Sequence, residues 1–457
     1  MFKKTIDSIN EKIKKGNAVV LTAEEILKMK TSYNIKEISK KVDIVTTGTF
    51  GAMCSSGVFM NFGHPKIPIR MEKVKINGVL AHSGLAAVDV FLGAASVSKD
   101  NPTYGGAHII EELLDGKDIK LEAEAKGTDC YPRKKLSTYL NINDLNECYL
   151  YNPRNCYQNY AAAVNSSNKS IYTYMGKLLP KFGNLTYSTS GELSPLLNDP
   201  ELETIGIGTK ILLGGAKGFI SWQGTQYNTK IKTNKFNIPV APARTLALTG
   251  NLKKMNSNFI KAAYFKNYGV TIYIGVAVPI PILNERILEN VLVSNEEIET
   301  IICDYSKSKH PVIGKTNYKN LRTGKIKLNN KNIKTSSLSS LFKARQIAEE
   351  LKDKILNKDF YLTKPVKKLP KKSIFKNLKI RKKRNKKTVD KKSKKITAKK
   401  LKFEYGKCIS CGACISLCNT RALHFNKVNK LVFEKDLCSN CYECVDACPL
   451  ELFKIKE

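Results

Sequence analysis

The feature that most constrains the fold is a block of cysteines near the C-terminal end, where eight of the thirteen lie within residues 408–448. They form two runs that share one spacing, C-x2-C-x2-C-x3-C: Cys408, Cys411, Cys414 and Cys418, then Cys438, Cys441, Cys444 and Cys448. Three thiolates on such a tight loop can bind three corners of an iron–sulfur cubane, and the fourth binds the neighbouring cluster. The repeated spacing therefore predicts two [4Fe–4S] clusters in a small ferredoxin-like domain, which we expect over residues 403–457.

The exchange of the fourth cysteine gives the expected ligands of each cluster. One cluster is expected to bind Cys408, Cys411, Cys414 and Cys448, and the other Cys438, Cys441, Cys444 and Cys418. A zinc site and a disulfide framework are the alternatives. Zinc sites use pairs of C-x2-C, not runs of four, and a disulfide module has no reason to repeat an identical spacing. Two clusters are therefore the preferred interpretation.

The length of 457 residues suits two or three domains. Residues 1–15 are charged and amphipathic, and they lack the apolar centre of a signal peptide. The longest apolar run, residues 270–283, is too short to span a bilayer and contains two prolines. Thiolate-bound clusters and unpaired cysteines fit a reducing compartment. We therefore expect a soluble, cytoplasmic protein with no membrane association.

The formal net charge of +37 is concentrated in one segment, because twenty Lys or Arg residues and a single acid, Asp390, lie between Lys364 and Lys402. Like charges repel and keep such a run extended, so the sequence predicts a basic, lysine-rich linker over residues 358–402. Nonspecific binding of a nucleic acid by residues 381–387 is the alternative. Lysine outnumbers arginine 67 to 10, whereas base-reading surfaces favour arginine. Nucleic acid is therefore not an expected partner.

The first 357 residues mix helix and strand signals irregularly. Capping boxes and apolar residues at helical spacing predict helices at residues 22–30, 294–303 and 336–356. Apolar runs next to glycines predict strands at residues 42–45, within 206–218 and at 270–278. The strand at 42–45 leads into a glycine-rich segment, residues 46–57. The sequence thus predicts one α/β or α+β domain over residues 1–357, with a topology that it does not determine.

Two cysteines of this domain are candidates for chemistry. Cys54 follows a strand and lies among glycines and serines, where backbone N–H groups can converge on a thiolate or an oxyanion. A small buried cysteine beside a turn explains the same pattern equally well. Cys130 precedes Arg133 and two lysines, and cations stabilise thiolates and persulfides, although Asp129 opposes them.

Three histidines lie in turn-like sequence, and with two arginines they are candidate handles for a carboxylate or an aldehyde: His64, His82, His108, Arg70 and Arg244. Each of the histidines fits a hydrogen-bonded loop residue better than a catalytic one. The remaining cysteines of the domain lie in less distinctive sequence and are interpreted as structural: Cys148, Cys156 and Cys303.

Over about residues 2–357 the chain resembles the archaeal homocysteine biosynthesis family, the L-aspartate semialdehyde sulfurtransferases. The resemblance is carried by residues 9–25, 46–57, 127–133 and 206–218, the last followed by Gln223-Gly-Thr-Gln226. It implies an enzyme that incorporates sulfide reductively into L-aspartate 4-semialdehyde to form L-homocysteine, a step of methionine biosynthesis. It also implies that Cys130 carries a persulfide, that Cys54 is a second essential thiol, and that electrons come from two [4Fe–4S] clusters, here fused to the same chain.

The resemblance implies further partners, namely aspartate semialdehyde and sulfide, an external electron donor and a sulfur-donor protein. The chain departs from the family pattern in having a lysine-rich linker where some members continue into paired CBS domains. It also lacks the small extra domain of the usual iron–sulfur partner. Two alternatives stay open. One is ferredoxin-dependent sulfur transfer to another aldehyde, and the other is a noncatalytic electron carrier or sulfur-relay scaffold.

Overall fold

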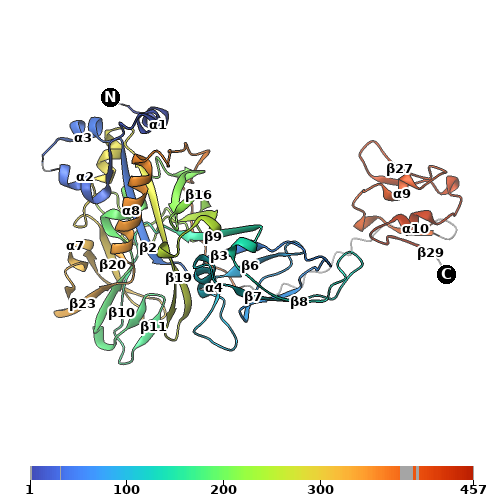
Figure 1. Cartoon of the computed structure of the whole chain (residues 1–457), viewed down its shortest axis with the longest axis horizontal. Helices are drawn as coiled ribbons and strands as arrows, with labels where there is room; N and C mark the ends of the chain where they lie inside the picture. The colour runs from blue at the N-terminus through green and yellow to red at the C-terminus, as the bar shows by residue number, and fades with distance from the viewer. Residues whose placement is uncertain (1–2, 31, 381–394, 398–400, 456–457) are drawn as a thin grey trace. The chain divides into compact units, whose positions relative to one another are not determined.

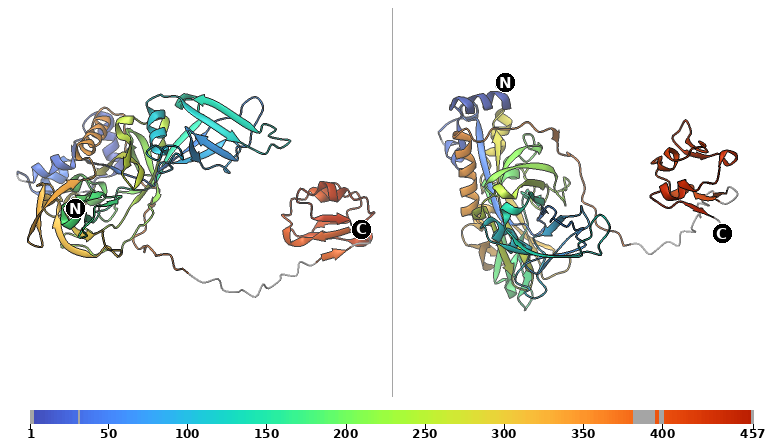
Figure 2. Two further views of the ribbon diagram at one scale, coloured as in Figure 1. Left: turned by 90° about the horizontal axis from the view of Figure 1, so that it is seen from below. Right: turned by 45° about the vertical axis from the view of Figure 1, so that its right-hand side comes forward.

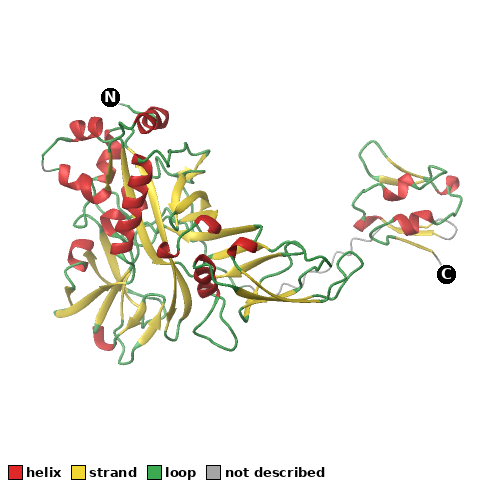
Figure 3. Cartoon of the chain, in the orientation of Figure 1, coloured by secondary structure: helices red, strands yellow, loops and turns green. Residues whose placement is uncertain are grey.

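The computed structural model describes residues 3–30, 32–380, 395–397 and 401–455, which form two compact units, Met1–Lys376 and Asn377–Glu457 (Figure 1). Strands make up most of the first unit, and helices are interspersed among them (Figure 3). The predicted mixed α/β architecture is therefore confirmed. Of the predicted linker, residues 381–394 and 398–400 lie outside the described residues, and the linker stays a prediction. None of the helices in the described part of the chain is long and apolar enough to cross a membrane.

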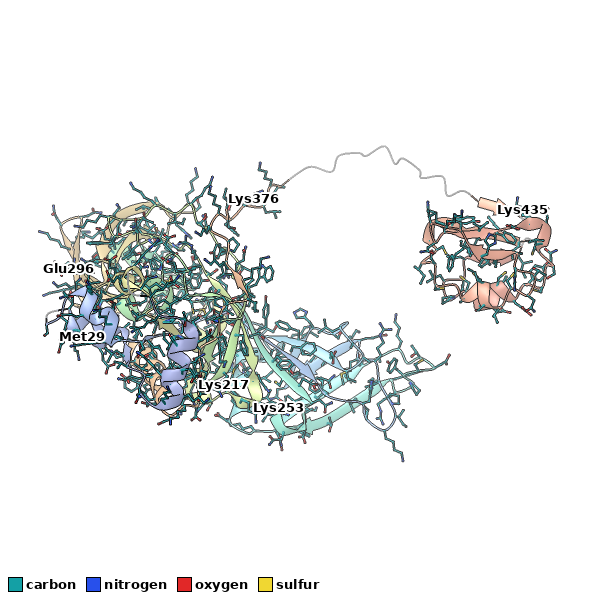
Figure 4. All side chains as sticks on the ribbon, turned by 90° about the horizontal axis from the view of Figure 1, so that it is seen from above. Met29, Lys217, Lys253, Glu296, Lys376 and Lys435 are labelled. Carbon is teal, nitrogen blue, oxygen red and sulfur yellow. The ribbon has the colours of Figure 1, made fainter. Side chains whose placement is uncertain are left out.

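The first unit is built on a ten-stranded sheet in which nearly all neighbours are antiparallel. Its strands, in spatial order, are β1 (Val20–Thr22), β2 (Ile44–Ala52), β19 (Gly269–Pro281), β15 (Lys210–Leu213), β16 (Ala216–Gln223), β17 (Leu246–Asn251), β9 (Glu147–Asn155), β3 (Gly57–Asn61) and β6 (Asp89–Gly93), with β18 (Ile260–Phe265) paired to β19. Side chains fill the space between the ribbons of this unit (Figure 4). The sheet thus has its long strands, β2 and β19, beside each other in the core.

Strand β2 is longer than the strand predicted at residues 42–45, because it continues through the glycine-rich segment as far as Ala52. The glycines serve packing there rather than a turn. A Cβ at Gly48 would lie 2.2 Å from the carbonyl oxygen of Ala344 on helix α8 (Leu341–Leu356). Helix α8 begins after its N-cap, Ser340, and packs against β2 and β19. The helix predicted at 336–356 is therefore confirmed from Leu341 onward, and the residues just before it belong partly to a strand.

A second sheet of six strands lies beside the first. Its order is β21 (Val312–Asn317), β20 (Glu299–Asp304), β10 (Ala162–Val164), β13 (Asn184–Tyr187), β23 (Lys331–Ser337) and β22 (Lys325–Leu328). The helix predicted at residues 294–303 is wrong. The Glu297 carboxylate does accept hydrogen bonds from the N–H and the hydroxyl of Ser294, at 2.7 and 3.0 Å. The β-branched run that follows nevertheless enters β20, between two partner strands. Burial on a sheet overrides the local capping signal.

A third sheet projects from the first unit as an arm (Figure 2). It consists of β5 (Val79–Ala81), β4 (Lys73–Ile76), β7 (Ile119–Glu124) and β8 (Lys135–Leu140). Helix α4 (Gly106–Leu114) precedes β7. Because Ile119 pairs with Leu140 and Glu124 with Lys135, the loop of residues 125–134 lies at the far end of the β7–β8 hairpin (Figure 1).

The remaining helices of the first unit are short. They are α1 (Ile6–Lys15), α2 (Ala23–Met29), α3 (Ile35–Lys41), α5 (Pro195–Asn198), α6 (Glu285–Val291) and α7 (Tyr318–Leu321). Helix α2 confirms the helix predicted at 22–30, with the capping box between Thr22 and Glu25 in place. Two small ladders complete the unit: β11 (Ile171–Thr173) with β12 (Gly176–Leu178), and β14 (Gly206–Ile207) with β24 (Lys367–Lys368). The chain therefore still packs on this unit beyond residue 357, where Phe360 is fully buried.

The second unit consists of two similar halves. Its strands are β25 (Lys395–Thr397), β26 (Leu401–Glu404), β27 (Leu423–Phe425), β28 (Leu431–Phe433) and β29 (Phe453–Ile455), and its helices are α9 (Ala413–Ser416) and α10 (Glu443–Ala447). Each cysteine run passes from a short 3-10 turn into one of these helices. The rings of Phe403 and Phe453 stack with centroids 4.4 Å apart in the core. Because the apolar core is so small, the cysteines make up much of the interior.

Candidate functional site

Cys54 lies in the turn that joins β2 to β3. The turn is closed by Ser56, whose backbone N–H and hydroxyl both donate to the carbonyl oxygen of Met53, at 3.1 and 2.7 Å. The N–H of Met53 in turn donates to Ile272 of β19, at 2.7 Å. The turn is therefore attached to the centre of the main sheet. The Cys54 side chain is partly exposed and lines a pocket of about 190 Å³.

The Cys54 pocket is assembled from segments that are far apart in the sequence. Arg154 comes from the end of β9, Tyr174 from the turn between β11 and β12, Gln226 from the loop after β16, and Tyr268 from the turn between β18 and β19. Tyr157 and Tyr160 lie in the loop after β9 and also line the pocket. Four tyrosines thus contribute to the wall of the pocket.

Tyr268 is the direct partner of the thiol, because its hydroxyl donates to Sγ of Cys54 at 3.7 Å. Burial raises the pKa of Tyr268, and the proximity of Cys54 raises it further. Burial likewise raises the pKa of Tyr157 to about 12 and that of Tyr160 beyond its usual range. These three phenols therefore remain neutral O–H donors at ordinary pH.

Arg154 supplies a positive charge to this aromatic pocket. Its guanidinium lies near two of the phenols, where it opposes the effect of burial and lowers the pKa of Tyr157 and of Tyr268. Its Nε is buried and has no hydrogen-bond partner within the described residues. Tyr268 and Arg154 were both missed in the sequence, because neither lies in a motif and only the fold brings them next to Cys54.

The structure does not bring Cys130 into the Cys54 pocket. Cys130 is exposed in the loop of residues 125–134, at the far end of the arm. Within that loop Thr128 and Tyr131 exchange backbone hydrogen bonds, both of 3.0 Å. The ring of Tyr131 stacks on His64 with centroids 5.6 Å apart, and Arg133 Nε donates to the carbonyl oxygen of Ile67 at 3.0 Å. The thiol is thus presented to solvent on a loop with defined hydrogen bonds.

The remaining histidine, arginine and cysteine candidates of the first unit lie outside the lining of the Cys54 pocket. His108 Nδ1 accepts a hydrogen bond from the N–H of Gly105 at the start of α4. Arg244 donates to the carbonyl oxygen of Pro200 at 2.6 Å, away from the Cys54 pocket, and Arg70 is exposed on the arm. His82 lies in a β-bridge with Phe91. Burial raises the pKa of the three remaining cysteines, as expected of neutral core thiols: Cys148, Cys156 and Cys303.

The eight cysteines of the second unit surround two small cavities. Each cavity is bounded by three cysteines of one run and the last cysteine of the other. The first has Cys408, Cys411, Cys414 and Cys448, and the second has Cys438, Cys441, Cys444 and Cys418. The structure therefore brings together the two sets that the sequence predicted.

Most of the thiols in these cavities are partly or fully buried, and they lie close to one another. Burial, with neighbouring thiols as a further cause, raises the pKa of Cys414 to about 11 and that of Cys444 to about 12. Such thiolates require bound cations to offset their desolvation. The backbone N–H of Ser410 donates to Cys408 Sγ and that of Leu452 to Cys448 Sγ, both at 3.4 Å. Such N–H···S contacts tune the potential of an iron–sulfur cluster.

Comparison with known proteins identifies two families. The homocysteine biosynthesis enzyme family, described as sulfur-incorporating, matches residues 18–362, and the 4Fe-4S dicluster domain matches residues 381–452. The chain is 50% identical over 382 residues to the L-aspartate semialdehyde sulfurtransferase of Methanosarcina acetivorans, covering 83% of this chain and 74% of that protein. No solved structure matches the chain.

Two further relatives come from other methanogenic archaea. The L-aspartate semialdehyde sulfurtransferase of Methanocaldococcus jannaschii is 50% identical over 384 residues, covering 80% of this chain and 73% of that protein. An uncharacterized protein of Methanothermobacter thermautotrophicus is 31% identical over 333 residues, covering 70% of this chain and 72% of that protein.

Proposed function

Because the chain belongs to the homocysteine biosynthesis family of sulfur-incorporating enzymes, we propose that it is an L-aspartate semialdehyde sulfurtransferase that forms L-homocysteine. The observation that carries the proposal is the Cys54 pocket, which lies in the part of the chain matched by the family. It offers a thiol, neutral phenol donors and one cation around a space large enough for a four-carbon aldehyde. The two relatives named for this activity support the choice of substrate.

We propose that sulfur enters at Cys130. Its exposure at the end of the arm suits access by sulfide or by a sulfur-donor protein. Sulfide that attacks a Cys54–Cys130 disulfide breaks the S–S bond, leaves a persulfide on Cys130 and releases the Cys54 thiolate. The outer sulfur of the persulfide then adds to the aldehyde carbon, whose oxygen takes up a proton.

Cys54 completes the exchange. Its thiolate attacks the sulfur of Cys130, the substrate's thiohemiacetal sulfur leaves, and the disulfide between the two cysteines forms again. The released thiohemiacetal loses water to give a thioaldehyde, which needs two electrons and two protons to become the thiol of homocysteine. The Tyr268 hydroxyl, 3.7 Å from Cys54 Sγ, stabilises the thiolate that this sequence requires. Because Cys130 lies outside the pocket, the loop of residues 125–134 must enter a Cys54 pocket, of the same chain or of a second copy.

We also propose that the two cysteine sets of the second unit hold two [4Fe–4S] clusters. The cavities bounded by four cysteines each support this assignment, as does the match to a 4Fe-4S dicluster domain. Such clusters, when bound, supply single electrons at low potential, which suits the reduction of a thioaldehyde. An external reductant would have to recharge them after each turnover.

An anaerobic assay tests the proposed function. The full chain with reconstituted clusters is incubated with aspartate semialdehyde, sulfide and a reductant, and homocysteine is measured by mass spectrometry. We expect product that disappears without reductant, and we expect the Cys130→Ala variant to retain cluster absorbance but form none. The exposed variant Ser137→Ala on β8 is the matched control. A chain with intact clusters that forms no homocysteine would overturn the proposal and favour an electron carrier or sulfur relay. If a thiol product forms only from another aldehyde, that aldehyde is the substrate instead.

Mixing variants tests how the two cysteines meet. A Cys54→Ala chain retains Cys130, and a Cys130→Ala chain retains Cys54. If the loop acts across chains, the mixture regains turnover that neither variant has alone. If the loop acts within one chain, the mixture stays inactive.

A further inference from the structure

We propose that Arg154 binds the carboxylate of the substrate in the Cys54 pocket and so selects α-amino acid aldehydes over simple aldehydes. The inference rests on the proposed function and deepens it by assigning the group that recognises the substrate. It is carried by the position of Arg154, by its unpaired Nε and by the charge balance of the pocket.

The backbone around Arg154 is attached to neighbouring segments by hydrogen bonds. It lies near the end of β9, which pairs with β3 on one side and with β17 on the other. The backbone N–H of Arg154 donates to the Asn152 side chain at 3.1 Å. The preceding carbonyl oxygen, on Pro153, accepts a 2.9 Å hydrogen bond from the N–H of Thr225. This last contact attaches the loop that brings Gln226 to the pocket. Gln226 has a φ of 64°, in the left-handed region that is costly for residues other than glycine.

Among the described residues, the charge of Arg154 has no counter-charge within ion-pair distance. Most other arginines of the first unit pair with a glutamate: Arg244 with Glu201, Arg286 with Glu203, Arg322 with Glu192 and Arg345 with Glu24. No such pair is found for Arg154 within the described residues. No carboxylate lies among the side chains that line its pocket, and the raised pKa values of Tyr157 and Tyr268 keep these two phenols protonated. A partly buried cation without an anion is costly unless a ligand provides one.

The substrate supplies the missing anion. Its carboxylate can accept two parallel hydrogen bonds from a guanidinium, a planar geometry that arginine matches better than lysine. With the carboxylate held by Arg154, the aldehyde end can reach Cys54, to which Tyr268 donates a hydrogen bond. The same phenol can donate to the aldehyde oxygen during sulfur addition. Arg154 is thus a substrate-binding residue, and it fixes the orientation of the reacting carbon.

The test compares two substrates and two variants. L-Aspartate semialdehyde and its decarboxylated counterpart, 3-aminopropanal, are assayed with the wild-type chain and with Arg154→Gln. We expect kcat/KM for the amino acid aldehyde to fall about 10- to 100-fold, as the loss of a charge-assisted hydrogen bond implies, with little change for 3-aminopropanal. Arg154→Lys should lie between the two, and Arg286→Gln on the surface is the matched control. Equal losses on both substrates, or no loss, would overturn the inference.

A second readout does not depend on turnover. The full chain is alkylated with iodoacetamide, and the modification of Cys54 is followed by peptide mass spectrometry. L-Homoserine, which keeps the carboxylate but has no aldehyde, should slow the alkylation of Cys54 in the wild type but not in Arg154→Gln, and 3-aminopropan-1-ol should not slow it in either. If protection holds but no homocysteine forms, the proposed function fails and the inference stands. If homocysteine forms, but Arg154→Gln still shows protection of Cys54 by L-homoserine and still prefers the amino acid aldehyde, the inference about Arg154 fails and the proposed function stands.

Discussion

At the scale of single residues, the chemistry of Cys54 depends on a neighbour that can donate but cannot ionise. The Tyr268 hydroxyl contacts Sγ of Cys54, and burial and the nearby thiol both keep the pKa of this phenol above its usual value. A neutral O–H stabilises a thiolate more than it stabilises a thiol, since a hydrogen bond to the charged form is the stronger one. In the proposed exchange, Tyr268 therefore supplies a hydrogen bond to the attacking sulfur of Cys54.

The Tyr268→Phe substitution isolates this contribution, because it keeps the ring and removes the donor. We expect kcat to fall about 10- to 100-fold, the value of one hydrogen bond to a charged group. The thermal unfolding midpoint should change little, since the hydroxyl lies in a partly exposed pocket. Tyr264→Phe on β18, whose exposure is 38% against 39% for Tyr268, is the control. An unchanged kcat in Tyr268→Phe would mean that the contact plays no part in the reaction.

The sequence predicts some of these residues and misses others for a physical reason. The cluster cysteines can be assigned because a cubane imposes a short, fixed spacing on its ligands. Cys54 and Cys130 stand out in local sequence and through the family resemblance. Arg154 and Tyr268 carry no such local signal. They reach the pocket only because β9, β18 and β19 are assembled into one sheet, and long-range pairing cannot be read from neighbouring residues.

At the scale of elements, helix α8 lies unusually close to strand β2. The approach occurs at Gly48, where the carbonyl oxygen of Ala344 occupies the space of a side chain. We expect Gly48→Ala to lower the free energy of unfolding of the first unit by about 1–3 kcal/mol, the usual cost of overpacking. Gly51→Ala, on the same strand, meets nothing closer than 3.5 Å and should stay within about 0.5 kcal/mol of the wild type. Urea unfolding measures both, and equal stabilities would contradict the close contact.

A buried carboxylate joins helix α1 to the start of the main sheet. Asp43 is fully buried and bonds to Lys4 at 2.9 Å, to Lys12 at 2.7 Å and to the N–H of Val19 at 3.1 Å. Burial alone would raise the pKa of Asp43, but the hydrogen bonds from Lys12, Lys4 and Val19 outweigh it and hold the pKa below its usual value. Burial lowers the pKa of Lys4.

Asp43→Asn should therefore destabilise the chain by about 3–5 kcal/mol, because it removes the carboxylate that balances the positive charge of Lys4 and Lys12 in a buried position. The depressed pKa also sets a pH dependence. Asp43 contributes its full stability above the unfolded pKa of about 4 and loses it as the pH falls through the lower folded pKa. Thermal unfolding of wild type and variant between pH 2 and pH 7 should show the difference between them shrinking in acid. A difference that is constant across this range would refute the assignment.

Elements were predictable where local and tertiary signals agree. Helices α2 and α8 combine N-capping residues with an apolar face, so both signals in their sequences favour a helix. Residues 294–303 combine a capping signal with a β-branched run, and the buried position between β10 and β21 decides for a strand. The glycines of β2 did not distinguish a turn from a closely packed strand, since a residue without a Cβ permits both.

At the scale of the whole molecule, the chain combines a sulfur-handling unit and an iron–sulfur unit. The sequence predicts that a basic segment links them, since twenty basic residues lie between Lys364 and Lys402 and like charges extend a chain. A tether of this kind would hold the electron donor near the pocket at an effective concentration of about a millimolar. Electron delivery would then be independent of protein concentration.

Cleaving the tether tests that expectation. A protease site placed between residues 385 and 390 allows the full chain to be purified, loaded with clusters and then cut. The intact chain should form homocysteine at a rate per molecule that does not change on dilution. After cleavage the rate should fall as the protein is diluted to micromolar concentrations, because a weak contact between separate pieces dissociates there, and excess cleaved protein should restore it. If the cut and intact chains respond identically to dilution, the two units associate tightly without the linker, and the tether has another role.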